Sequence, residues 1–142
     1  MSVPVPKRHS GELEVNVCTR ELCLYTLRIL ANEKIFPASQ AYIIQEIRET
    51  VLDIHTTCWE ANNIKVSKNM VLFEQRTSMQ IHAGNACNKL YALIEIAKPL
   101  FHLRSSKASY WQSLVVKTRN KIRAWYDSDA KRLNPTRDEN AC

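Results

Sequence analysis

The chain has 142 residues, of which 24% are charged and 45% hydrophobic, and its formal net charge at pH 7 is +6. This length suits one domain with a core of its own, and two glycines are too few for a sheet protein with many turns. Five cysteines without a CxxC pair argue against a disulfide scaffold, and the lack of an apolar run near ~20 residues argues against a membrane span. We therefore expect a cytoplasmic protein with reduced thiols.

Both ends of the chain lack apolar periodicity. Residues 1–11 contain Pro4 and Pro6, and residues 133–142 contain Pro135 within a polar run. We predict a disordered lead and a disordered tail there, because neither segment can continue a helix or bury much apolar surface. Residues 12–132 are predicted to form one domain.

The first two amphipathic segments span residues 12–33 and 38–62. In the second, apolar residues recur at intervals of three and four, which is typical of a helix with one buried face and unlike the alternation of a strand. These residues are Ile43, Ile47, Val51, Ile54, Cys58 and Ala61. Pro37 separates the two segments, and Ser39 is the candidate N-cap of the second helix.

The third segment spans residues 67–98. One helical face is predicted to hold Phe73, Thr77, Ile81, Gly84, Cys87, Tyr91, Ile94 and Lys98. On that face Gly84 is expected to permit the close approach of a neighbouring backbone, although it costs up to ~1 kcal/mol relative to Ala. Pro99 is expected to end or kink this helix near Ala97.

The fourth segment spans residues 106–132, with Ser106 as its candidate N-cap. Its apolar stripe is Trp111, Val115, Thr118, Ile122 and Trp125. Four helices with short connections predict an all-α fold, an up-down-up-down antiparallel four-helix bundle.

Charge is divided unevenly along the chain. Residues 12–60 carry eight acidic and four basic residues, a net of −4, whereas residues 61–126 carry eleven basic and two acidic residues, a net of +9. Clustered Lys and Arg raise the local potential toward phosphates, so the pattern favours a polyanionic partner over catalysis.

The strongest candidate for a nucleic-acid site is the fourth helix, because residues 104–126 contain six basic residues and no acid. On a helical wheel Lys117 and Lys121 lie on one shoulder of the apolar stripe, and Arg119 and Arg123 lie on the other. These four are the primary candidates, and the secondary ones are Lys107, Arg76 and Lys89. The alternative is that acidic helices of a neighbouring copy neutralise this surface, which predicts a salt-sensitive oligomer without affinity for RNA.

Signals for an enzyme are weak. His55 and Cys58 are three residues apart on one helix, but no second pair completes a metal site, so a buried imidazole and thiol are expected. No glycine-rich phosphate loop, GxSxG elbow or paired carboxylates occur. We predict no catalytic residues, no metal and no cofactor.

Four stretches within residues 12–130 carry a resemblance to a known family. They are ELCLYTLRIL, FPASQAYIIQEIRETVLDIHTTCWEANN, FEQRTSMQIHAGNACNKLYALIEIAKPLF and WQSLVVKTRNKIRAWY. Together they resemble a bacterial four-helix-bundle family, which contains proteins encoded in intervening sequences of ribosomal RNA genes. The same family contains the accessory variability determinant (Avd) proteins of diversity-generating retroelements.

Two departures from the ribosomal intervening-sequence members favour the Avd branch. Those members usually end the second helix in an acidic-glycine turn, where this chain has EANN. Their fourth helix is short or weak, whereas the fourth helix of this chain is long and basic. The resemblance implies a ring-like homopentamer with a basic surface, which binds a reverse transcriptase and its template RNA, with cDNA as a further candidate. It implies support of mutagenic cDNA synthesis without catalysis, and no membrane or small-molecule substrate. The alternative is a structural protein–protein interaction bundle that binds no nucleic acid.

Overall fold

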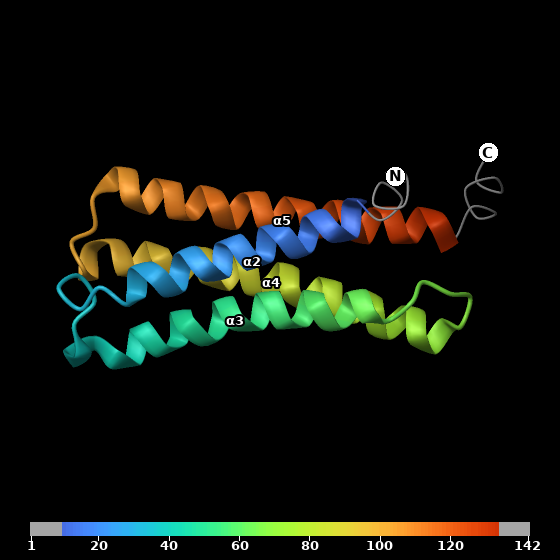
Figure 1. Cartoon of the computed structure of the whole chain (residues 1–142), viewed down its shortest axis with the longest axis horizontal. Coiled ribbons are helices and arrows are strands. Elements are labelled where there is room, and N and C mark those ends of the chain that lie inside the picture. Colours follow the sequence, from blue (N-terminus) through green and yellow to red (C-terminus); the bar gives the residue numbers. More distant parts are fainter. Residues whose placement is uncertain (1–9, 134–142) are drawn as a thin grey trace, which may run out of the picture.

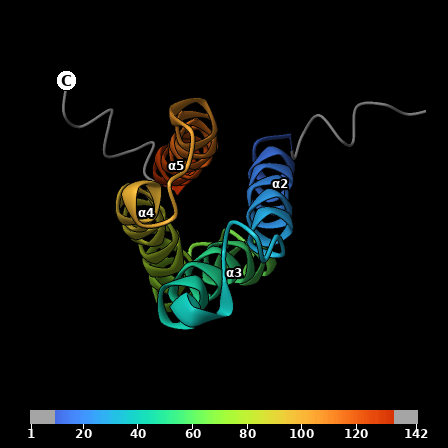
Figure 2. The same cartoon turned by 90° about the vertical axis from the view of Figure 1, so that its left-hand side faces the viewer.

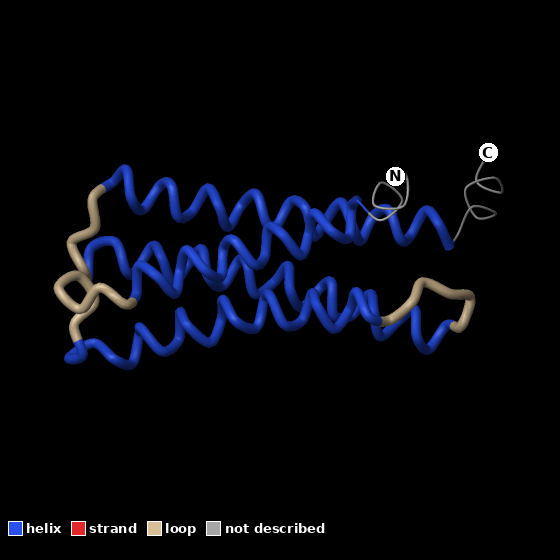
Figure 3. The backbone as a smooth tube through the Cα atoms, viewed as in Figure 1, coloured by secondary structure: helices blue, strands red, loops and turns tan. Residues whose placement is uncertain are grey.

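The computed structural model describes residues 10–133, and their side chains from residue 14 onward. Four α-helices make up this part of the chain: α2 (Ser10–Leu30), α3 (Ala41–Asn63), α4 (Met70–Leu100) and α5 (Ser105–Leu133). A 3-10 turn, η1 (Ala38–Gln40), precedes α3. The described residues contain no strand (Figure 3), which confirms the all-helical prediction. Most of the predicted disordered lead and tail, residues 1–9 and 134–142, lies outside the described residues.

Each helix packs against two others. The neighbours of α3 are α2 and α4, and the neighbours of α5 are α4 and α2. Figure 1 shows that the chain reverses direction at each connection, and Figure 2 shows the four helices end-on. Two side-chain pairs between α3 and α4 agree with this course. Asp53 contacts His82, and Glu46 contacts Lys89. The partner on α4 therefore lies seven residues later when the residue on α3 lies seven residues earlier.

The predicted stripes of α3 and α5 form the centre of the core. On α3, the residues from Ile47 to Ala61 that lie on the stripe are completely buried, and only Ile43 at its start is half-buried. On α5, all five residues of the stripe, from Trp111 to Trp125, are buried. The periodicity of both segments is therefore confirmed.

The predicted buried face of α4 is wrong, because the helix is rotated about its axis relative to the prediction. Of the eight residues assigned to it, only Cys87 and Ile94 are buried, whereas Ile81 is 50% exposed. The buried face is Arg76, Gln80, Ala83, Ala86, Cys87, Leu90, Ile94 and Ala97. Apolar residues occur all around this 31-residue helix, so several stripes were equally compatible with its sequence.

Gly84 does not allow a close approach of another backbone. A Cβ atom at this position would have no atom within 4 Å outside the helix's own backbone. Because Gly84 is half-exposed beside α5, the missing side chain leaves open space on the surface of α4.

The helix ends differ in part from the predictions. Ser39 lies inside η1 and Ser106 lies in the first turn of α5, so neither is an N-cap. The cap of α4 is Asn69, whose Oδ1 accepts hydrogen bonds from the backbone N–H groups of Val71 (3.0 Å) and Leu72 (3.3 Å). Helix α4 runs through Pro99 and ends at Leu100, three residues beyond Ala97, where an end or a kink was predicted.

Among the described helices, none combines the length and the apolar character that crossing a membrane requires.

Candidate nucleic-acid interface

Helix α5 presents two basic edges on either side of its buried stripe. Trp111, Val115 and Ile122 anchor one face in the core, and the charged positions on both flanks stay outside it. Lys117 and Lys121 lie toward α2, whereas Arg119 and Arg123 lie toward α4. The two shoulders inferred from the helical wheel are therefore found in the structure, and they face different helices.

The edge facing α2 is partly neutralised. Lys121 Nζ lies 3.7 Å from Glu14 Oε1, and Lys117 lines the surface between α2 and α5 together with Glu21. The pKa of the neighbouring Cys18 thiol is raised, because its burial outweighs the opposing effect of these two lysines. The positive potential of Lys117 and Lys121 is thus shared with two acids of α2.

The edge facing α4 has one carboxylate nearby, Asp127, which lines the same surface but forms no ion pair with Arg119 or Arg123 in the described residues. Arg119 Nη1 donates a hydrogen bond to Asn88 Oδ1 (3.1 Å), and the described residues give neither Arg119 nor Arg123 an ion pair. These arginines are one helical turn apart, where like charges cost roughly 0.2–0.5 kcal/mol in an isolated helix. Unpaired cations at this spacing suit contacts with successive or shared phosphate oxygens.

Arg119 and Arg123 border a groove with a volume of about 340 Å³, which we call the α4/α5 groove. It is lined by Gln80, Ile81, Gly84, Asn85 and Asn88 of α4 and by Arg119, Ile122, Arg123, Tyr126 and Asp127 of α5. The open space above Gly84 forms part of this groove. Its lining joins two guanidinium groups, three amides, one carboxylate, two isoleucines and an aromatic ring.

Arg76 is a correction to the predicted set. Its side chain is buried, where Nε and Nη2 donate to the carboxylate of Asp129 (2.6 and 3.2 Å) and Nη1 donates to Ile64 O (2.6 Å). Its guanidinium also lies 5.1 Å from the ring centroid of Trp125, within the range of a cation–π contact. Because this guanidinium is buried, it cannot reach a phosphate, and its contacts link α4 to α5 instead.

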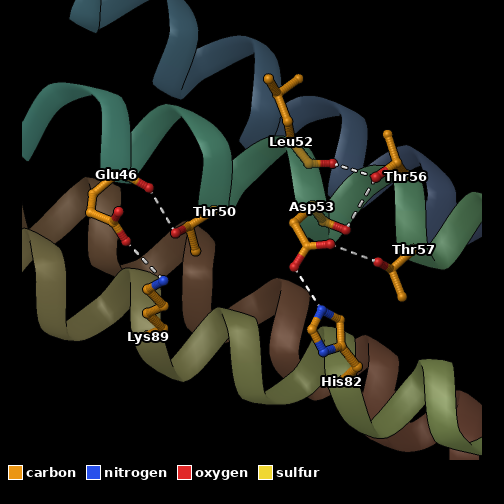
Figure 4. Close-up of polar contacts among 8 residues, drawn as sticks. All are labelled: Glu46, Thr50, Leu52, Asp53, Thr56, Thr57, His82 and Lys89. Carbon is orange, nitrogen blue, oxygen red and sulfur yellow. Dashed lines mark hydrogen bonds and ion pairs between the residues drawn. The ribbon is translucent and has the colours of Figure 1, made fainter.

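Lys89 is exposed but belongs to a different surface. Its Nζ lies 2.9 Å from Glu46 Oε1 of α3, on the side of α4 that faces α3 (Figure 4). The hydrogen bond with Glu46 raises the pKa of Lys89. On the same surface His82 Nε2 lies 2.6 Å from Asp53 Oδ2, and this carboxylate also accepts from Thr57 (Figure 4). The α3/α4 surface is therefore mixed in charge, and Lys89 does not extend the basic edge of α5.

Lys107 lies near the start of α5, ten residues before Lys117 and so about 15 Å away along the helix axis. It is half-buried and lines a cavity with His102 and Arg104. Of the seven predicted residues, the structure brings together Arg119 and Arg123 on the α4/α5 groove, and it places Lys117 and Lys121 on the edge that faces α2. It leaves Lys107, Lys89 and Arg76 apart from both.

Two of the tryptophans are structural. Trp111 and Trp125 are buried, and Trp111 Nε1 donates a hydrogen bond to Thr26 Oγ1 (2.9 Å), so neither ring is open to a base. Trp59, in contrast, is 54% exposed near the end of α3. The aromatic side chains available on α5 are Tyr110, which contacts Tyr25 edge-on, and the half-buried Tyr126 in the α4/α5 groove.

No metal site is formed by the described residues, since no group of three or more His, Cys, Asp or Glu side chains lies close enough together. His55 Nδ1 lies 2.8 Å from Thr19 Oγ1, and burial lowers the pKa of this imidazole. Burial raises the pKa of both Cys58 and Cys87 to about 12, so these thiols stay protonated and unreactive at neutral pH.

Sequence reasoning missed the α4 side of the groove. Gln80, Asn85 and Asn88 are spaced by three to five residues, as expected for one helical face. The predicted stripe of α4 included their neighbours Ile81 and Gly84 but assigned that face to the core and left the amides out. The usable signal was Gly84, an unusual residue inside a helix, which sits among these amides. Comparison of the chain with protein families, with curated proteins and with solved structures finds no match.

Proposed function

We propose that the protein is a non-catalytic accessory protein of the Avd type, which acts in the cytoplasm and binds template RNA through α5. In this proposal the antiparallel bundle is one subunit of a ring-like homo-oligomer, a pentamer by the family resemblance. The ring binds the reverse transcriptase of the retroelement and holds the template near it, and cDNA is a second candidate ligand.

One observation carries the proposal: Arg119 and Arg123 lie on one groove and form no ion pair among the described residues, although Asp127 also lines that groove. Stability alone does not favour two like charges one turn apart, whereas binding a polyanion does. The groove is also wide enough for a ligand and is not filled by side chains.

The mechanism follows from electrostatics. Each guanidinium can donate two parallel hydrogen bonds to a phosphate, and release of the counterions condensed on RNA supplies much of the free energy of binding. Repetition of the same edge on each subunit of a ring would bind one RNA at many points, with an avidity greater than that of one site. Such a protein positions RNA and performs no chemistry.

The second candidate function is a structural protein–protein module that binds no nucleic acid. It is favoured by the ion pairs that already neutralise Lys121 and Lys89 within the chain. The acidic residues Glu46, Glu49 and Asp53 of the α3/α4 surface would then meet the arginines of the next copy.

A charge-reversal pair separates the two functions. In Arg119→Glu/Arg123→Glu, we expect retention of a labelled RNA to be lost at moderate salt while the helical content and the oligomeric state stay unchanged. The matched control is Lys117→Glu/Lys121→Glu, which makes the same change of charge on the edge facing α2 and should retain more RNA. If the arginine variant retains RNA as well as the unmodified protein, the RNA function is wrong. If its oligomer dissociates, the second function is supported.

A further inference from the structure

The α4/α5 groove differs from a plain cationic surface in its volume of about 340 Å³ and in its mixed lining. Ile81 and Ile122 contribute apolar atoms, Tyr126 an aromatic ring, and Asn85 and Asn88 amides. Arg119 and Arg123 stand beside these neutral groups, and the missing side chain of Gly84 leaves the space over α4 open. Phosphate binding by itself requires only the two arginines.

Two residues of the lining also have buried polar atoms that lack partners among the described residues. Gln80 is 1% exposed, and its Nε2 donates to Asp129 Oδ2 (2.8 Å), but its Oε1 has no hydrogen-bond partner among the described residues. The same is true of Nε of Arg119 on the facing helix. An unsatisfied buried polar group costs about 1–3 kcal/mol, so one free acceptor and one free donor beside a single groove point to a ligand with both kinds of group.

An unpaired nucleotide has this combination of properties. A base has an apolar face that stacks on aromatic rings and an edge with donors and acceptors that amides and arginine recognise. Its own phosphate carries the charge that two neighbouring guanidinium groups attract. The carboxylate of Asp127, which also lines the groove, can accept from an amino group of the base.

We infer that the α4/α5 groove binds a single unpaired nucleotide of the RNA. The base lies over Gly84 against Tyr126, and its phosphate lies between Arg119 and Arg123. This inference rests on the proposed RNA-binding function and adds that the protein selects unpaired over paired positions. A volume of about 340 Å³ suits one small planar group, whereas a partner helix would need a longer apolar channel.

The test compares two RNA probes, a 20-base-pair duplex and the same duplex with one bulged adenine. Base stacking on an aromatic side chain changes affinity between about 5-fold and about 150-fold, so we expect the bulged probe to bind at least 5-fold more tightly. Gly84→Leu fills the groove without changing any charge, and it should remove this preference, so that the two probes bind equally. Gly84→Ala, whose Cβ would meet no atom within 4 Å, is the matched control and should keep the preference.

A second pair of variants guards against misfolding of the leucine variant. Tyr126→Ala should lose the preference for the bulge, and Tyr126→Phe should keep it, because phenylalanine retains the stacking face. Equal binding of both probes by the unmodified protein, or an unchanged preference in Gly84→Leu, would overturn the inference. The proposed function would survive those results if Arg119→Glu/Arg123→Glu still abolished RNA binding, and it would fail separately if that variant bound both probes normally.

Discussion

Replacing Asp129 by Ala tests whether Arg76 is a buried structural cation. Asp129 and Arg76 are each 1% exposed, and three hydrogen bonds converge on this carboxylate: two from Arg76 (2.6 and 3.2 Å) and one from Gln80 (2.8 Å). Without Asp129 the guanidinium stays buried without its counter-charge, and breaking such a pair costs about 3–5 kcal/mol. The remaining contacts of Arg76 with Ile64 O and Trp125 place the expected loss near the lower limit, about 3 kcal/mol.

The assay is urea unfolding followed by circular dichroism. Against a typical total of about 5–15 kcal/mol, a loss of about 3 kcal/mol also lowers the melting temperature on the order of 10 °C. Asp127→Ala, two residues earlier and exposed, is the control and should stay within about 0.5 kcal/mol of the unmodified protein. The paired variant Arg76→Met/Asp129→Leu should recover much of the stability and bind RNA normally. If Asp129→Ala and Asp127→Ala unfold at the same urea concentration, the buried pair does not hold α4 to α5.

Three further predictions concern single side chains. Asn69→Ala should cost about 0.5–2 kcal/mol of unfolding free energy by removing the cap of α4, whereas Ser78→Ala on the exposed face of the same helix should not. Cys58 and Cys87 should resist iodoacetamide at pH 8 until urea unfolds the chain, because burial raises the pKa of each to about 12. Mass spectrometry of timed samples shows whether either thiol is labelled in the native protein. His55 should make stability fall as the pH drops below 6.5. Burial, assisted by Arg20, lowers the pKa of this imidazole in the folded state below its value of 6.5 in the unfolded chain. Between these two pKa values the unfolded chain binds more protons, so protonation favours unfolding. Unfolding free energies measured from pH 7.5 to pH 5 should show a smaller decline in His55→Gln, and an identical decline would contradict this assignment.

The sequence predicts α3 and α5 well because each has one clear apolar stripe. In both helices the residues at intervals of three and four are the ones that the structure buries, apart from the half-buried Ile43. Periodicity could not orient α4, whose apolar residues surround the helix, so its face toward α5 was missed. The amides of the α4/α5 groove were missed for the same reason.

The sequence also could not predict which charged residue is buried. Arg76 looks like any surface arginine in the sequence, and its partner Asp129 is 53 residues away. Only the packing of α4 against α5 brings the two together, and local patterns carry no information on such a pairing. Arg119 and Arg123 were identified because the stripe of α5 fixes which flank they occupy.

The most direct test of the central claim, that Arg119 and Arg123 bind phosphates of RNA, is the salt dependence of RNA affinity. For single-stranded RNA the slope of log K against log salt is about −0.7 per neutralised phosphate, so Arg119→Gln/Arg123→Gln should reduce its magnitude by about 1.4 per site. Lys117→Gln/Lys121→Gln removes the same charge from the edge that acids of α2 partly neutralise, and it should change the slope much less. If both pairs change the slope equally, or neither changes it, the α4/α5 groove is not where this protein binds RNA.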